Sequence, residues 1–211
     1  MLSKTQSRWA AAATILFFFL LIGVVLRLNY ISIIDDTIIN GIVPIRSHFF
    51  NSFFIKLTNS LNPIPTVIIA LILSLVLQLW QHKIRITLFF LVNSTLIAGG
   101  INNLVKNLVD RPRPTVHHLV LAGSSSFPSG HAMTAMLLGG SLIVILNLLV
   151  KNKNIRYLLT GLIIIWIFLI GFSRVYVHVH YPTDVIAGWC LGFICLTISQ
   201  KIFSPPSVNN K

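Results

Sequence analysis

The chain has 211 residues, of which 55% are hydrophobic and only 9% are charged, and its mean hydropathy is +0.85. A soluble domain would be about a quarter charged, so the composition excludes an ordinary soluble protein and indicates one integral membrane domain over residues 1–211. The net charge of +12 does not indicate nucleic-acid binding, because the excess lies in short segments between apolar stretches, where anchoring to anionic lipid headgroups accounts for it.

Six apolar stretches are close to the ~20 residues that a helix needs to cross the hydrocarbon core of a membrane. The predicted fold class is therefore all-α, a polytopic membrane protein with six transmembrane helices. The predicted spans are residues 9–28, 64–80, 86–104, 131–150, 157–172 and 185–203. The first span follows two basic residues, as a secretory signal would. It is longer than the apolar region of such a signal, however, and no small-residue cleavage site follows it, so we expect it to be retained.

The segment between the first two spans, residues 29–62, has the pattern of helices that lie in the membrane interface. Its apolar residues recur at steps of three and four: Ile38, Ile42, Ile45, Phe49 and Phe53. Pro44 is expected to interrupt the helix. Two interpretations stay open, a plain connector and a lip that guides a lipid to a nearby site. At the other end of the chain, residues 204–211 are expected to form a flexible tail.

Basic residues predict the orientation of the chain in the plasma membrane. With the N-terminus in the cytoplasm, six spans return the C-terminus to the cytoplasm. The inner segments then carry nine of the 16 Lys and Arg residues, and three of the seven outer ones belong to the polar blocks described next. Without those three, a clear positive-inside bias remains. All four acidic residues fall outside: Asp35, Asp36, Asp110 and Asp184.

Three short polar blocks stand at the outer edges of the spans, and the first contributes cations. Lys106 and Arg113 lie near the end of the third span, and Pro114 stiffens the following turn. Positioned Lys and Arg side chains stabilise the negative charge that spreads over the oxygens of a phosphoryl group in transfer. Arg111 lies between the two, and we interpret it as a charge that anchors the chain to lipid headgroups.

The second block, residues 127–131, begins the fourth span. Ser129 is a good helix N-cap, and Gly130 lets a ligand come close to the backbone. Free N–H groups at the start of a helix bind anions. His131, just inside the helix, is placed to donate a proton to a leaving oxygen.

The third block contains Arg174, His180 and Asp184. His180 and Asp184 are four residues apart and would share one face of a helix, so the carboxylate would accept a hydrogen bond from one ring nitrogen. The other nitrogen would keep its lone pair, as a nucleophile or a metal ligand requires. His178 is the weaker candidate, because Pro182 stands four residues after it and cannot orient it.

A metal site is the main chemical alternative for this set of residues. Only Asp110 and Asp184 among the acids lie near the blocks, and several cations surround them. That environment would repel Mg²⁺ and attract phosphate, so we expect a reaction without a metal or another cofactor.

The three blocks resemble the signature of the type 2 phosphatidic acid phosphatase (PAP2) superfamily, K-x6-R-P, P-S-G-H and S-R-x5-H-x3-D. All eleven signature residues are present with the family's spacing: Lys106, Arg113, Pro114, Pro128, Ser129, Gly130, His131, Ser173, Arg174, His180 and Asp184. Six spans with an outward-facing site are also similar to the family, so the resemblance covers nearly the whole chain. One departure is His178, where many members carry a small residue such as glycine.

The resemblance implies a mechanism in two steps. His180 attacks phosphorus and forms a phosphohistidine, Asp184 orients its ring, and His131 protonates the departing lipid oxygen and then assists water. The phosphoryl oxygens are held by three cations and by the backbone of the second block: Lys106, Arg113, Arg174, Ser129 and Gly130.

The small size and outward orientation are similar to the bacterial branch of the family, which includes phosphatidylglycerophosphatase B and the undecaprenyl pyrophosphate phosphatases. The implied partner is a lipid phosphate or diphosphate, with undecaprenyl pyrophosphate first and phosphatidylglycerophosphate or phosphatidic acid as alternatives. A transporter that uses the blocks to recognise headgroups is the alternative of another class. It would not need His131, His180 and Asp184 together. The sequence does not indicate an oligomeric state.

Overall fold

A computed structural model describes residues 4–123 and 125–203. Over these residues the chain consists of helices and connecting loops, without strands. The predicted all-α class is thereby confirmed. In chain order the elements are α1 (Lys4–Val25), α2 (Asn29–Ile42), the 3₁₀ turn η1 (Val43–Ile45), α3 (His48–Asn59), α4 (Pro63–Gln81), α5 (Ile84–Val92), the π-helical turn η2 (Asn93–Ile97), α6 (Ala98–Val109), α7 (Gly130–Leu149), α8 (Lys153–Tyr176) and α9 (Pro182–Phe203). The predicted tail, residues 204–211, lies outside the described residues.

Six helices in the described residues are long and apolar enough to cross a membrane, in agreement with the six predicted spans. The third combines α5, η2 and α6 into one helix of 26 residues. The fifth span was predicted too short, as residues 157–172. Asn152 caps the start of α8 by accepting hydrogen bonds from the amides of Asn154 and Ile155. At its other end α8 continues to Tyr176, so Arg174 is a residue of the helix.

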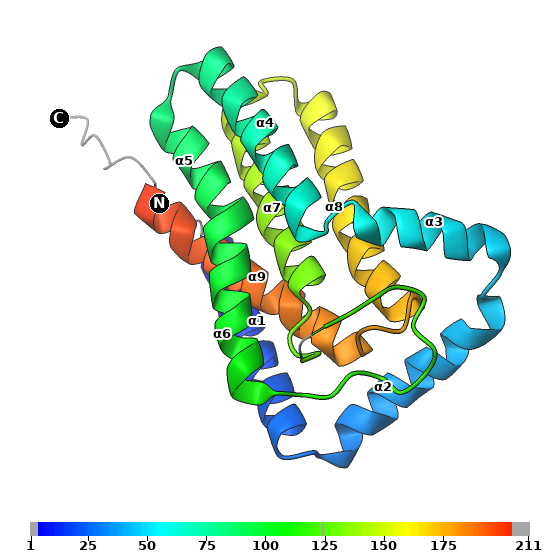
Figure 1. Ribbon diagram of the computed structural model, residues 1–211. Helices are drawn as coiled ribbons and strands as arrows, with labels where there is room; N and C mark the ends of the chain where they lie inside the picture. The colour runs from blue at the N-terminus through cyan, green and yellow to red at the C-terminus, as the bar shows by residue number, and fades with distance from the viewer. Residues whose placement is uncertain (1–3, 124, 204–211) are drawn as a thin grey trace.

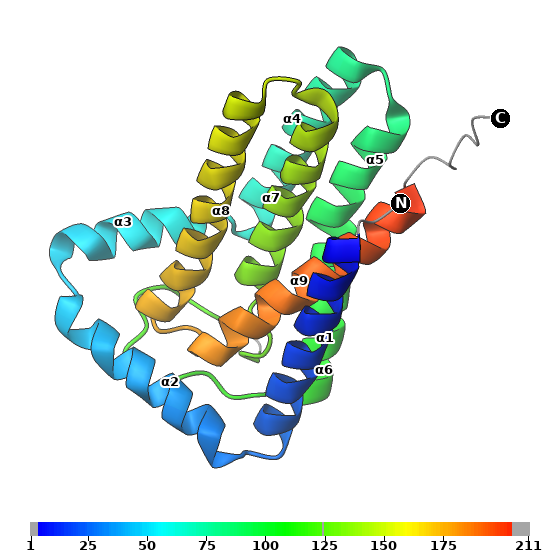
Figure 2. The ribbon, with the colours of Figure 1, turned by 180° about the vertical axis from the view of Figure 1, so that it is seen from behind.

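Helix α7 stands at the centre of the molecule, packed against α8 on one side and α9 on the other (Figures 1 and 2). Helix α9 crosses the upright helices at a steep angle and carries α1 along its length. The crossing of α7 and α9 is close because Gly188 presents no side chain. A Cβ built there would lie only 2.5 Å from the carbonyl oxygen of Ser129. This glycine therefore sets the distance between the second and third polar blocks.

Helices α2 and α3 extend to one side of the bundle and meet at η1, which contains the helix-breaking Pro44 as predicted (Figure 1). The apolar stripe predicted in this segment faces mostly outward. Its exposed members are Ile38, Ile45, Phe49 and Phe53. The inner face of α2 is formed instead by Ile31, Asp35, Ile39 and Ile42.

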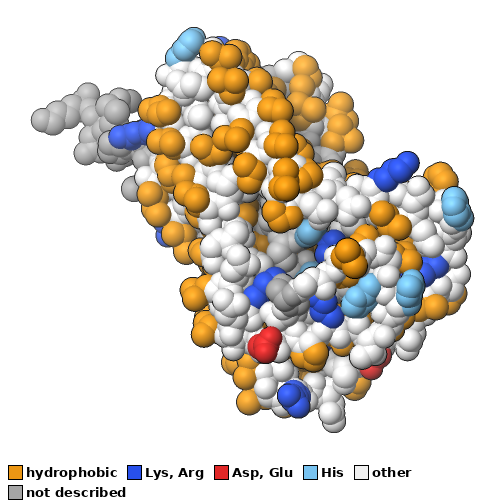
Figure 3. All heavy atoms as spheres, viewed as in Figure 1, with side chains coloured by type: hydrophobic (Ala, Val, Ile, Leu, Met, Phe, Trp, Pro, Cys, Tyr) orange, Lys and Arg blue, Asp and Glu red, His pale blue; other side chains and the backbone are white. Residues whose placement is uncertain are grey.

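The ends of four helices meet at one end of the bundle: α6 and α8 finish there, and α7 and α9 begin there (Figures 1 and 2). The long loop between α6 and α7 crosses this end toward α2 and α8. In the space-filling view, Lys, Arg and His side chains gather over this loop, whereas the upright helices above it present mainly hydrophobic side chains (Figure 3). The three polar blocks therefore lie together.

Candidate active site

The first block places two cations beside the α6–α7 loop. Lys106 lies in the last turn of α6 with only 7% of its surface exposed, and its Nζ donates to the carbonyl of Ser125. The helix ends at Val109, and its C-cap Asp110 has a left-handed backbone (φ 43°) that turns the chain into the loop. Beyond the turn, Arg113 Nη1 donates to the carbonyl of Val179 at 2.5 Å. Lys106 thus points into the α6–α7 loop, and Arg113 points toward the turn after α8.

The second block starts α7 as predicted. The Ser129 hydroxyl caps the helix by accepting a hydrogen bond from the amide of Ala132 at 3.5 Å. The Ser129 amide donates to the carbonyl of Asp184 at 3.0 Å, which joins the second block to the third. His131 Nε2 lies 3.2 Å from Oδ1 of Asn62, a residue of the turn between α3 and α4.

The third block is built by a turn rather than by one helix. His180 lies in the turn between α8 and α9, and α9 begins only at Pro182, so the prediction that His180 and Asp184 share a helix face is wrong. The turn folds back over the end of α8, because the amides of Val179 and His180 both donate to the carbonyl of Arg174. This geometry brings His180 Nδ1 to 3.5 Å from Asp184 Oδ2.

The two ring nitrogens of His180 have opposite surroundings. Nδ1 faces the carboxylate of Asp184, and Nε2 lies 3.4 Å from the Arg113 guanidinium. Burial lowers the pKa of His180 well below its ordinary value, and the nearby charges of Arg174, Arg113 and Lys106 lower it further. The ring is therefore neutral at pH 7 and keeps a lone pair, as a nucleophile requires.

Arg174 is 5% exposed and donates to the hydroxyl of Thr58, near the end of α3. The turn that follows α3 also places the side chain of Asn62 in contact with His131. The segment between the first two spans thus forms one wall of the site. Neither contact was predicted from the sequence.

The interpretation of Arg111 as a headgroup anchor is wrong. Its side chain is only 12% exposed and pairs with two carboxylates, Asp184 at 2.6 Å and Asp35 at 2.7 Å. Burial alone would lower the pKa of Arg111, but these two carboxylates raise it above its ordinary value. Arg111 is therefore permanently charged, and it belongs to the site rather than to the membrane surface.

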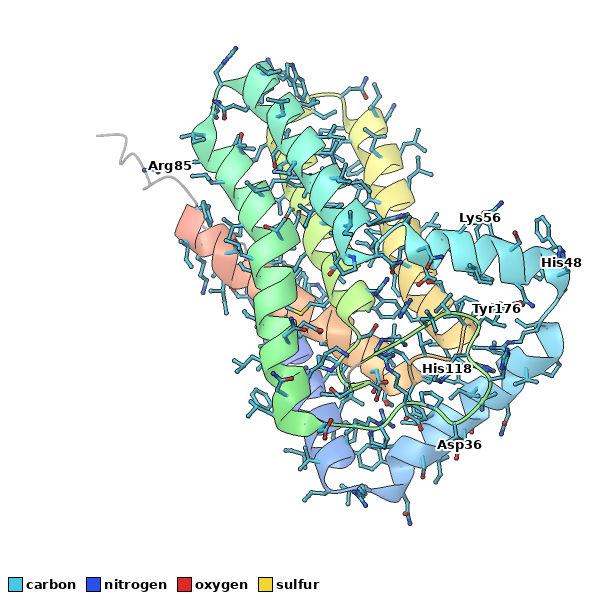
Figure 4. All side chains as sticks on the ribbon, viewed as in Figure 1. Asp36, His48, Lys56, Arg85, His118 and Tyr176 are labelled. Carbon is cyan, nitrogen blue, oxygen red and sulfur yellow. The ribbon has the colours of Figure 1, made fainter. Side chains whose placement is uncertain are left out.

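His178 occupies a left-handed position (φ 59°) in the turn after α8, a conformation that glycine adopts at least cost. Its side chain is fully buried. Burial first, and then Arg46 and His118, lower its pKa to about 4. Figure 4 shows His118 and Tyr176 between α2, α3 and the end of α8. The turn that contains His178 lies in the same region. The backbone explains why a glycine suits this position.

Asp35 is the residue of this neighbourhood whose role was hardest to predict from the sequence. A signal was nevertheless present, because Asp35 stands four residues from both Ile31 and Ile39 and so shares the apolar face of α2. An acid on the inner face of an amphipathic helix needs a buried partner.

No group of three or more His, Cys, Asp or Glu residues in the described chain is arranged to hold a metal ion.

The chain is similar to known proteins of one family. Residues 87–205 match the model of the PAP2 superfamily. The chain is 30% identical over 186 residues to phosphatidylglycerophosphatase B of Bacillus subtilis, covering 84% of this chain and 87% of the relative. It is 32% identical over 140 residues to undecaprenyl-diphosphatase of Sulfolobus acidocaldarius, covering 58% of this chain and 57% of the relative.

The fold is similar to the crystal structure of a transmembrane PAP2-type phosphatidylglycerolphosphate phosphatase from Bacillus subtilis. The TM-score is 0.80 at 24% identity, and the match covers 92% of this chain and 94% of the other. A multi-pass helical bundle with clustered histidines and cations defines a membrane phosphatase of this type. The chain belongs to the PAP2 superfamily.

Proposed function

We propose that this protein hydrolyses a lipid phosphate or diphosphate through a phosphohistidine intermediate. The observation that carries the proposal is the meeting of a buried His180–Asp184 pair with three cations at one end of the bundle. The cations are Lys106, Arg113 and Arg174. A neutral imidazole among positive charges suits attack on a phosphate, because the cations hold the oxygens while the ring keeps its lone pair.

In the first step, the Nε2 lone pair of His180 attacks phosphorus and the bond from phosphorus to the leaving oxygen breaks. The leaving oxygen takes a proton from His131, at the start of α7. The imidazole becomes positively charged as the P–N bond forms, and Asp184 stabilises that charge through Nδ1–H. Nε2 carries the lone pair because the guanidinium beside it can only donate hydrogen bonds, which leaves the ring proton on Nδ1, toward the carboxylate.

In the second step, water attacks phosphorus, His131 accepts its proton, and the P–N bond breaks to release phosphate and restore neutral His180. The cations and the N–H groups around Ser129 and Gly130 bind the oxygens in both steps. Each of these roles uses chemistry that the side chains and backbone supply directly, so we expect no metal requirement.

We further propose that the site faces the outside of the plasma membrane and that both termini are cytoplasmic. The end of the bundle opposite the site carries a row of basic residues: Lys4, Arg8, Lys83, Arg85, Lys151, Lys153, Arg156 and Lys201. Such residues favour the cytoplasmic side. A reporter enzyme that works only in the cytoplasm should be active when it is fused after residue 203, and one that works only outside should be inactive. The reverse result would overturn this orientation.

Undecaprenyl pyrophosphate is our first proposed substrate, and the relative from Sulfolobus acidocaldarius carries that activity in its name. Phosphatidylglycerophosphate is the second candidate, since the relative with the longer match is named for it.

The test is phosphate release by the purified full-length chain from a panel of three lipids: undecaprenyl pyrophosphate, phosphatidylglycerophosphate and phosphatidic acid. His180→Ala should abolish release and EDTA should leave it unchanged. Release by His180→Ala would overturn the nucleophile assignment, and loss with EDTA that Mg²⁺ restores would overturn the metal-free mechanism. Binding of these lipids without release from any of them would favour a headgroup-recognition role.

A further inference from the structure

Asp35 is a buried carboxylate on α2 that takes no part in the mechanism described above. It is only 1% exposed, and α2 lies outside the six candidate spans. A buried carboxylate is costly unless it is paired and hydrogen-bonded. Its partners therefore indicate what it does.

Those partners belong to the start of α9 and to the α6–α7 loop. Asp35 Oδ1 accepts a hydrogen bond from the Thr183 amide at 2.9 Å, and Oδ2 accepts one from the Thr183 hydroxyl at 2.9 Å. The Thr183 amide lies in the first turn of α9, where backbone N–H groups have no partner within the helix. Asp35 thus supplies, from a different helix, the acceptor and the negative charge that stabilise a helix N-terminus.

Arg111 connects Asp35 to the carboxylate beside the nucleophile. Its Nη2 donates to Asp35 Oδ2 at 2.7 Å and its Nη1 to Asp184 Oδ1 at 2.6 Å. The guanidinium also lies 4.0 Å from the centre of the Tyr181 ring. Asp184 Oδ2 accepts from the Tyr181 amide at 2.9 Å and faces His180 at 3.5 Å. One oxygen of Asp184 therefore binds Arg111, and the other faces the ring of His180.

The charges in this chain of contacts do not cancel. Burial raises the pKa of Asp35, and its hydrogen bonds from Arg111 and Thr183 oppose that rise. With both carboxylates ionised around one guanidinium, the group Asp35–Arg111–Asp184 has a net negative charge beside His180. Without Asp35, Arg111 and Asp184 would form a neutral pair. The ring of His180 would then lose stabilisation at the moment when it becomes positively charged.

We propose that Asp35 is a positioning residue for the nucleophile, acting through Arg111 and Thr183. It holds the start of α9 so that Asp184 meets His180, and it shares Arg111 so that Asp184 keeps its negative charge for the phosphohistidine. This inference rests on the proposed function, because it assigns Asp35 to the charge that forms on His180 in that mechanism. A helix outside the predicted spans thereby contributes to the rate of the chemical step.

The test compares Asp35→Asn with Asp36→Asn in the purified full-length chain, on the panel lipid that the unaltered chain hydrolyses fastest. Asp36 is the exposed neighbour on the same helix and is a matched control. Asp35→Asn should lower kcat about tenfold with little change in KM, as loss of a supporting contact behind a reacting group does. Asp36→Asn should keep the kcat and KM of the unaltered chain.

Equal kcat in the two variants would overturn the inference. A lower unfolding temperature of Asp35→Asn would not support it, because a contact that only stabilises the fold would have the same effect. If Asp35→Asn does not fold, Arg111→Lys replaces it. Lysine keeps the positive charge but cannot bridge two carboxylates as a guanidinium does, so kcat should again fall with little change in KM. An unchanged kcat would overturn the inference.

His180→Ala is included to separate this inference from the proposed function. An inactive His180→Ala together with equal kcat in the two aspartate variants would overturn only the role of Asp35. An active His180→Ala would overturn the proposed function and the role of Asp35 with it.

Discussion

The Arg174 guanidinium donates to the hydroxyl of Thr58, a residue 116 positions away on α3. Both side chains are buried, Thr58 completely. The arginine of the fifth span to which we assign phosphate binding is thus oriented by the segment between the first two spans. This segment does more than connect two spans, since it fixes the direction of a cation in the site.

Thr58→Val tests that relationship. A hydrogen bond to a charged group contributes about 1.5 kcal/mol or more, so its loss should lower kcat/KM about tenfold for a phosphate that Arg174 binds. Thr58→Ser keeps the hydroxyl and should retain most of the activity. Steady-state phosphate release checks both variants, and equal kcat/KM for valine and serine would show that the contact does not orient Arg174.

The acid side of the pH profile tests the neutral state of His180. Burial and the three nearby cations lower its pKa below the ordinary value of 6.5, so the reactive neutral ring persists below pH 6.5 and is lost only at lower pH. The fall of kcat/KM on the acid side should therefore lie below pH 6.5. Removing a cation should allow the pKa of His180 to rise and should move this fall to higher pH.

Arg113→Gln removes the cation that lies closest to Nε2 in the described contacts. Its kcat/KM should be lower at every pH because phosphate binding weakens, and the position of the acid limb is the diagnostic quantity. Lys56→Gln, at an exposed lysine on α3, is the control and should leave the limb in place (Figure 4). An identical limb in both variants would contradict the assignment of that limb to His180.

His178 gives a prediction about stability rather than rate. Both His178→Gly and His178→Ala remove the buried ring, but only alanine must still adopt the left-handed conformation at φ 59°. That conformation costs a residue with a side chain about 1 kcal/mol, so the glycine variant should unfold about 2–4 °C above the alanine variant. Thermal unfolding in detergent measures the difference. Equal unfolding temperatures would mean that the backbone relaxes around alanine.

Local patterns in the sequence predicted much of the fold and part of the site. Apolar length alone predicted six spans, and Ser129 was correctly predicted as the cap of α7. The fifth span was predicted to end at residue 172, whereas α8 continues to Tyr176 and holds Arg174, which is buried and bound to the Thr58 hydroxyl. His180 and Asp184 were predicted to form a hydrogen bond on one helix face, whereas a turn brings Nδ1 to 3.5 Å from the carboxylate without a hydrogen bond.

Contacts between distant segments could not be predicted. Asp35 and Thr183 are 148 positions apart, and no helical period connects them. Only the packing of α2 against the start of α9 brings them together. The same packing explains the misreading of Arg111, because an arginine in a loop after a span has the sequence pattern of an anchor whether or not carboxylates lie nearby. The composition limits which residues can pair with a cation, and the tertiary structure determines which of them lie close enough to do so.

The crossing of α7 and α9 at Gly188 supports a final prediction. A methyl group at this position would lie 2.5 Å from the Ser129 carbonyl and 3.1 Å from the Ala132 side chain, so the two helices must separate to admit it. Overpacking of this kind costs about 1–3 kcal/mol. It would also move His131 away from Asp184 and His180, and a misplacement of ~1 Å at reacting groups costs about 100-fold in rate.

Gly188→Ala should therefore lose activity by at least about tenfold and unfold at a lower temperature. Gly161→Ala is the matched control, because Gly161 lies within α8 and a Cβ there has no neighbour within 4 Å. An alanine inside a helix is favoured over glycine by roughly 0.5–1 kcal/mol, so this variant should be as stable as the unaltered chain or more so, with full activity. Phosphate release and thermal unfolding of the two variants, measured side by side, separate the effect of close helix approach from that of glycine itself. If both variants behave alike, the spacing of α7 and α9 does not depend on the missing side chain, and the separation of the two histidines must be set by the turn before α9 instead.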